Sequence, residues 1–78
     1  MKNIEDLRKQ IDKLDDQIVS LLEKRMKTVK KIGQLKKKNN IQVFDKERWQ
    51  KVIKSKKGFV KKIWETIHDE SLKIERSV

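Results

Sequence analysis

The residues best suited to chemistry in this sequence are three cations of its first half, Arg8, Arg25 and Lys36. Arg25 occupies a position where a seven-residue apolar pattern predicts an aliphatic side chain. A buried cation there is costly unless it pairs with an anion. On a helix, Arg25 and Lys36 lie about 20° apart around the axis, so they can hold both ends of a small dianion. The pattern comprises Ile4, Leu7, Ile11, Leu14, Ile18 and Leu21, then Thr28, Ile32 and Leu35.

Arg8 is too distant to join such a site within one chain. It lies about 100° around the helix from Arg25 and roughly 25 Å along it. In an antiparallel dimer, Arg8 of the partner subunit could instead reach over the other chain's site. The simpler alternative is a weak pair between Arg8 and an acidic neighbour one turn away, such as Asp12.

The other polar candidates have equally simple readings. Arg25 can tilt out of the apolar stripe, and Lys36 suits the negative end of a helix dipole. Trp49 and Trp64 are expected in the core. His68 lacks a second His or Cys at ligand spacing, so it is expected to be structural or exposed, and no metal is expected. With no nucleophile motif or phosphate loop, an enzyme built from this chain works by binding and electrostatics.

Three helices, and no strand, are predicted to position these residues. The first spans about residues 4–38 behind an N-cap at Asn3, and Asn39-Asn40 ends it. The second spans about 46–55 behind an N-cap at Asp45, and the third spans about 59–76 after Lys57-Gly58. A 35-residue helix is roughly 52 Å long, too long for a globule of this size. We therefore expect an all-α chain whose paired long helices form an intertwined homodimer.

Composition limits the classes of protein to consider. The 78 residues, predicted to form a single domain over 1–78, are 44% charged and carry a formal net charge of +10. No cysteine, signal peptide or membrane-length apolar run is present, so we expect a cytoplasmic location and no membrane partner. The lysine clusters suit a nucleic-acid surface, a field attracting a small anion, or merely a solvated surface.

Four blocks of the sequence together resemble the all-helical chorismate mutases. They are LRKQIDKLDDQIVSLLEKR (7–25), IGQLK (32–36), VFDKERW (43–49) and IHDESLKIE (67–75). The resemblance implies the Claisen rearrangement of chorismate to prephenate, an isomerase reaction of the shikimate pathway to aromatic amino acids. That reaction needs no cofactor and no covalent step. It needs a compact substrate conformer and cations where negative charge develops.

The resemblance also implies roles for the cations. Arg25 and Arg8 of the partner subunit would bind the substrate carboxylates, with help from Arg48. Lys36 would donate to the ether oxygen of the breaking bond.

Three further polar residues match positions of the family pattern. Asp45 matches a contact to the substrate hydroxyl, and Ser71 matches a carboxylate-contacting serine. Glu75 stands where many members have a glutamine that donates to the ether oxygen, and a glutamate can donate only when protonated. The resemblance therefore places Arg25, Lys36 and Glu75 at the catalytic centre.

Two other departures from the family pattern affect the second helix. Trp49 replaces a glutamate that contacts the hydroxyl in some members, and the chain between Arg48 and Ser71 is shorter than the pattern. We expect the shortening to impair activity more than fold or dimerisation. The alternatives are a lyase removing pyruvate from isochorismate, an inactive helical dimer, and a basic nucleic-acid-binding module. Nucleic acid is not the expected partner.

Overall fold

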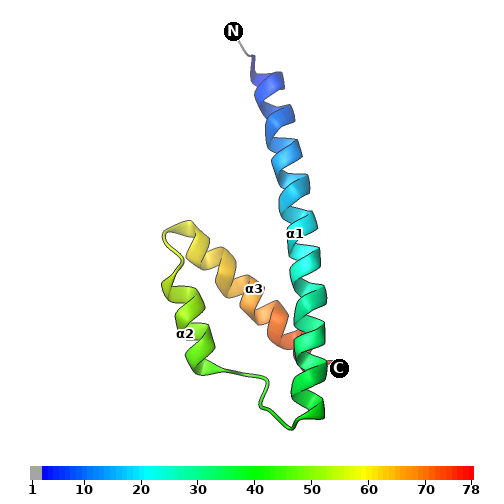
Figure 1. Ribbon diagram of the computed structural model, residues 1–78. Helices are drawn as coiled ribbons and strands as arrows, with labels where there is room; N and C mark the ends of the chain where they lie inside the picture. Colours follow the sequence, from blue (N-terminus) through cyan, green and yellow to red (C-terminus); the bar gives the residue numbers. More distant parts are fainter. Residues whose placement is uncertain (1–2) are drawn as a thin grey trace.

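The computed structural model describes residues 3–78, and in this range it contains three α-helices and no strand (Figure 1). They are α1 (Ile4–Lys38), α2 (Lys46–Lys54) and α3 (Phe59–Arg76). The all-α prediction is confirmed, and the second helix ends one residue earlier than predicted. Residues 1–2 lie outside the described range.

The helix ends are determined by local side-chain chemistry. The side chains of Asn3 and Asp45 each accept a hydrogen bond from the backbone N–H three residues on, at 2.9 and 3.0 Å, which confirms both N-caps. After α1, Asn40 adopts a positive φ of 56°, a left-handed conformation that Asn tolerates better than most residues. Gly58 adopts a φ of 61° just before α3, where a side chain would be strained.

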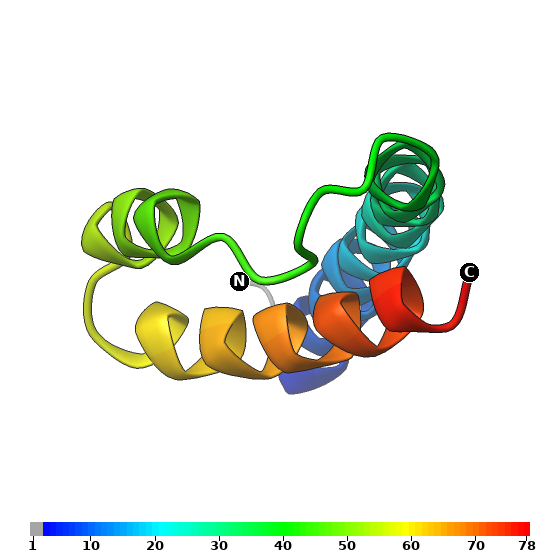
Figure 2. The same ribbon diagram turned by 90° about the horizontal axis from the view of Figure 1, so that it is seen from below.

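The helices pack in two pairs. Helix α3 crosses the C-terminal half of α1, and α2 packs against α3 but not against α1 (Figures 1 and 2). The crossing is close at Gly33, where an added Cβ would lie 2.8 Å from the Cα of Glu75. The residues buried in this small core are Val29, Gly33, Ile67 and Ser71.

The two tryptophans are not core residues, and that prediction is wrong. Both are only half-buried. Trp49 stacks on the imidazole of His68, and the ammonium of Lys56 lies 4.5 Å from the Trp64 ring centre. With only two short helices to cover α1, too little chain surrounds either indole to bury it.

The N-terminal half of α1 extends beyond the other two helices (Figure 1), and the chain measures 58 × 23 × 14 Å. The apolar stripe on this half is consequently exposed, at 47% for Leu7 and 64% for Leu21. No helix among residues 3–78 has the length and apolar character needed to cross a membrane. The exposed stripe members are Ile4, Leu7, Ile11, Leu14, Ile18 and Leu21.

Candidate active site

A cavity of about 290 Å³ lies where the three helices and the 39–45 connection meet. It is lined on one side by α1, on another by α2 and its N-cap, and on a third by α3. Six of the seven residues proposed from the sequence line this cavity, although they come from positions up to fifty apart. They are Arg25, Lys36, Asp45, Arg48, Ser71 and Glu75.

Two guanidinium groups give the cavity its positive character. Burial lowers the pKa of Arg25, and the charge of nearby Arg48 lowers it further. Both effects mean that the Arg25 cation is stabilised less here than in water. Among residues 3–78 no ion pair involves either arginine. Both guanidinium groups therefore remain able to pair with an anion that enters the cavity.

Ser71 holds the Arg25 side chain in place. Arg25 Nη1 donates a hydrogen bond of 2.9 Å to Ser71 Oγ. The serine is buried, and its hydroxyl lies 2.6 Å from the carbonyl oxygen of Ile67 one turn earlier, to which it donates. Arg25 therefore points toward α3 and the cavity, and the alternative in which it tilts away from the stripe is wrong.

Lys36 and Glu75 form an ion pair at the other end of the cavity. Lys36 Nζ lies 2.8 Å from Glu75 Oε1, and the two side chains are only 18% and 9% exposed. Lys36 Nζ also donates to the carbonyl oxygen of Val43 at 2.7 Å. The contact with Glu75 is an ion pair that lacks hydrogen-bond geometry, and this buried carboxylate oxygen has no hydrogen-bond partner in the described part of the chain.

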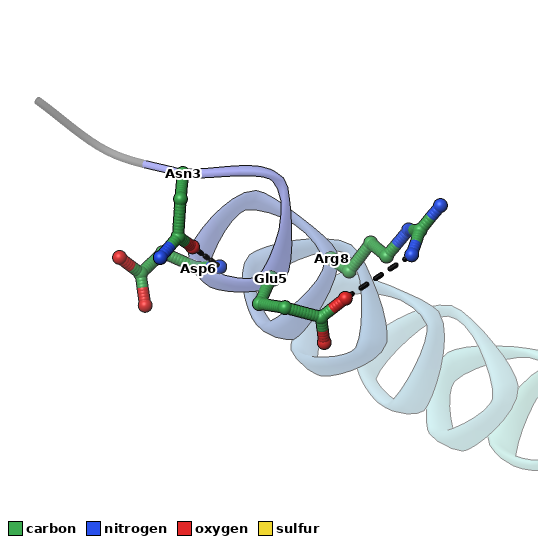
Figure 3. A network of polar contacts seen from close by, with 4 residues as sticks. All are labelled: Asn3, Glu5, Asp6 and Arg8. Atoms are coloured by element: carbon green, nitrogen blue, oxygen red, sulfur yellow. Dashed lines mark hydrogen bonds and ion pairs between the residues drawn. The ribbon is translucent and has the colours of Figure 1, made fainter.

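Arg8 is not part of this cavity. It lies on the projecting half of α1, where Arg8 Nη1 donates to Glu5 Oε1 at 3.1 Å (Figure 3). The partner is Glu5 rather than Asp12, and both side chains of the pair are about 70% exposed. An exposed pair of this kind contributes little to stability. Arg8 is therefore available to another molecule.

Two aromatic residues for which no ligand contact was predicted also line the cavity. The rings of Trp49 and His68 stack with centres 3.9 Å apart and an angle of 24° between their planes. His68 was expected to be structural or exposed, and it is half-buried and stacked in the cavity wall. Its position three residues before Ser71 and seven before Glu75 places all three on one face of a helix, a spacing visible in the sequence.

The inventory of the cavity limits its chemistry. It contains two guanidinium groups and an ammonium group, two carboxylates, a serine engaged in hydrogen bonds and an imidazole. In residues 3–78 no group of three His, Asp or Glu side chains could hold a metal ion. Such an arrangement can bind a small dianion and stabilise charge that develops on it.

Three comparisons place the chain among known proteins. Residues 7–76 match the family model of chorismate mutase type II. A bifunctional chorismate mutase/prephenate dehydratase of Aquifex aeolicus is 38% identical over 53 residues, which are 68% of this chain. The chain spans 15% of the length of that relative. A solved structure, titled a conserved hypothetical protein from Pyrococcus furiosus, matches with a TM-score of 0.89 and 36% identity.

The same solved structure bears on the short connection between α2 and α3. The match covers 96% of this chain and 97% of that one. Too little of the Pyrococcus chain is left unmatched to hold a substantially longer second helix. The compact arrangement of α2 and α3 is therefore shared by a second protein.

Proposed function

The chain belongs to the chorismate mutase type II family, and on this premise we propose that it catalyses the rearrangement of chorismate to prephenate. The observation that carries the proposal is the convergence of Arg25, Lys36 and Arg48 on one cavity. The substrate has two carboxylates, and two of these cations lack a carboxylate partner in the free chain. The substrate's charges thus complement those of the cavity.

In this proposal the cations both bind and orient the substrate. Arg25, supported by Ser71, and Arg48 hold carboxylates, and Asp45 accepts from the substrate hydroxyl. Fixing both carboxylates favours the compact conformer in which the two reacting carbon atoms approach. The reaction is unimolecular, so the site has to supply neither a nucleophile nor a cofactor.

Lys36 and Glu75 act on the bond that breaks. As the C–O bond lengthens, negative charge grows on the ether oxygen, and a donor placed there stabilises the transition state more than the substrate. Lys36 is such a donor once it turns from Glu75 and Val43 O toward the ligand. Protonated Glu75 is the second donor, through the oxygen that has no hydrogen bond in the free chain.

A second copy of the chain completes the site. Most of the apolar stripe of α1 is exposed, and a wider apolar groove of about 640 Å³ lies between α1 and the end of α3. Antiparallel pairing of two α1 helices would cover the stripe and remove this apolar area from water. The groove is lined by Val19, Leu22, Glu23, Met26, Lys27, Lys30, Ile74 and Ser77.

The same pairing accounts for Arg8. About 25 Å of helix separates Arg8 from Arg25 in one chain, whereas antiparallel pairing brings the N-terminal half of one α1 beside the C-terminal half of the other. Arg8 of the partner subunit would then close the cavity with a fourth cation. Its present pair with Glu5 is exposed and weak, so exchanging it costs little.

The direct test follows chorismate loss by ultraviolet absorbance and identifies the product by mass spectrometry. Prephenate has the same mass as chorismate, so a rearrangement leaves the mass of the compound unchanged. A lyase would instead release pyruvate and leave a lighter product. We expect turnover in the wild-type protein and at least about a hundredfold lower kcat/KM in Arg25→Ala. Lys31→Ala is the matched control, because it removes one charge from an exposed site on the same helix.

Two results would contradict the proposal. One is no turnover at millimolar chorismate at both acidic and neutral pH. The other is equal activity of Arg25→Ala and Lys31→Ala, which would mean that Arg25 has no specific role in the cavity. If there is no turnover, a basic binding module becomes the better interpretation, and binding to nucleic acid that weakens steeply with salt would identify it.

A further inference from the structure

His68 is the one titratable side chain lining the cavity to which the proposed mechanism gives no role. Its ring is fixed from two sides. Trp49 stacks on it at 3.9 Å, and the ring of Phe44 meets it nearly edge-on, with centres 5.9 Å apart and planes at 73°. Because a tryptophan from α2 and a phenylalanine from the preceding connection clamp it, the imidazole has a defined place in the cavity.

The ring nitrogens of His68 have no hydrogen bond to any residue in the range 3–78, although a partly buried imidazole normally finds one. The stacking on Trp49 occupies one face of the ring and engages neither nitrogen. Since the ring lines the cavity, a ligand filling that space lies beside the imidazole. The unpartnered nitrogens are then able to bond to it.

The charges around His68 come from all three helices. Arg25 and Lys36 face the cavity from α1, Asp45 and Arg48 from the N-terminal end of α2, and Glu75 from α3. Asp69 is its neighbour on α3. Burial lowers the pKa of His68, the carboxylates of Asp69 and Glu75 raise it by smaller amounts, and the charge of Arg25 lowers it. The balance is a lowered pKa, so the ring is neutral at neutral pH.

We propose that His68 is a ligand-contacting residue of this cavity, neutral when the cavity is empty and protonated when a dicarboxylate fills it. The inference rests on the proposed function only for the class of ligand. Two carboxylates entering the cavity bring negative charge beside the ring, which favours the imidazolium form. Binding of the ligand and of the proton then support each other, so the affinity for dicarboxylates rises as the pH falls.

The test measures protons taken up on binding. Prephenate, a dicarboxylate that is not consumed by the forward reaction, is titrated by calorimetry at pH 6.5 to 7.5 in two buffers of different ionisation enthalpy. The experiment uses Glu75→Gln protein, so that no carboxyl at position 75 contributes to the result. We expect proton uptake and a dissociation constant that rises up to about tenfold per pH unit, the limit for one linked proton.

Two variants show whether His68 is responsible. His68→Gln keeps hydrogen-bonding groups but cannot titrate, and His68→Phe keeps an aromatic ring against Trp49. Both are combined with Glu75→Gln, and circular dichroism establishes that they fold. We expect both to bind prephenate without proton uptake and with an affinity that no longer changes with pH.

The outcomes separate this inference from the proposed function. Binding with the same proton uptake in both His68 variants, or no uptake in the parent protein, overturns the role of His68 and leaves the dicarboxylate site standing. No binding of prephenate at any pH by the wild-type protein overturns the proposed function and this inference with it. Proton uptake that disappears in both His68 variants supports the role of His68 and the dicarboxylate site.

Discussion

The carboxylate of Glu75 lies 2.8 Å from the ammonium of Lys36, and both side chains are largely withdrawn from water. In the free chain, the two groups proposed to stabilise charge on the ether oxygen thus contact each other. In the proposed mechanism, substrate binding has to separate them. A charged Glu75 opposes this step twice, because it retains Lys36 and repels the oxygen that becomes negative.

The first prediction concerns the donor at position 75. An ionised carboxylate cannot donate a hydrogen bond to the ether oxygen, whereas an amide can. Glu75→Gln should therefore be more active than wild type at neutral pH. Steady-state kcat/KM of both proteins is the measurement. Equal or lower activity of the glutamine variant would disprove the role of Glu75.

The second prediction concerns the helix crossing that brings Glu75 to Lys36. At Gly33 an added Cβ would lie 2.8 Å from Glu75 Cα and 3.0 Å from Val78 Cγ2, so Gly33→Ala must push α3 away from α1. Alanine favours a helix by about 1 kcal/mol over glycine, but overpacking costs about 1–3 kcal/mol. We expect lower stability and a larger loss in kcat than in substrate affinity.

The control for Gly33→Ala is Gln34→Ala, which changes the next and exposed residue of the same helix. Urea unfolding and steady-state kinetics are measured for both variants. A more stable Gly33→Ala protein with unchanged kcat would show that the crossing adapts without moving Glu75.

The helix boundaries could be predicted because they depend on neighbours in sequence. Asn3 and Asp45 cap their own helices, and Gly58 permits the turn that precedes α3. The burial of Trp49 could not be predicted in this way, since it depends on how much chain packs around the indole. The role of Gly33 was also missed. A single glycine in a helix does not show which element crosses it.

The site residues could be predicted only in part from the sequence itself. Arg25 stood out because it interrupts an apolar pattern, and its distance from Arg8 followed from helix geometry. Contacts between side chains distant in sequence, such as that of Arg25 with Ser71, depended on the family resemblance. The stack of His68 on Trp49 had no counterpart in that resemblance. It required the packing of α2 against α3.

The third prediction is a loss of stability on mild acidification. Burial holds the pKa of His68 below its usual value of 6.5, so the unfolded chain binds this proton more tightly than the folded chain. The folded state therefore loses stability as the pH falls through about 6.5. His68 is the only histidine in the chain, so His68→Phe should remove the loss between about pH 7.5 and 5.5. Urea unfolding at both pH values is the check, and an equal loss in the variant would assign it to other groups.

The fourth prediction tests whether Arg8 acts across subunits. Arg8→Ala and Arg25→Ala should each be nearly inactive alone. In a heterodimer of the two, one site joins an intact Arg25 to an intact Arg8 of the partner subunit, and the other site lacks both. Random exchange makes about half of all dimers heterodimers, so the mixture should recover about a quarter of wild-type activity.

The alternatives give different results in the same experiment. If Arg8 served its own chain, each subunit of the heterodimer would lack one arginine, and mixing would restore nothing. If Arg8 had no role, Arg8→Ala alone would be fully active. A chain kept monomeric by Leu14→Lys, in the exposed stripe, should lose activity even though its own cavity is unchanged, because no second α1 then supplies Arg8. Light scattering of this variant checks that it is monomeric, and full activity of such a monomer would contradict a site shared between subunits.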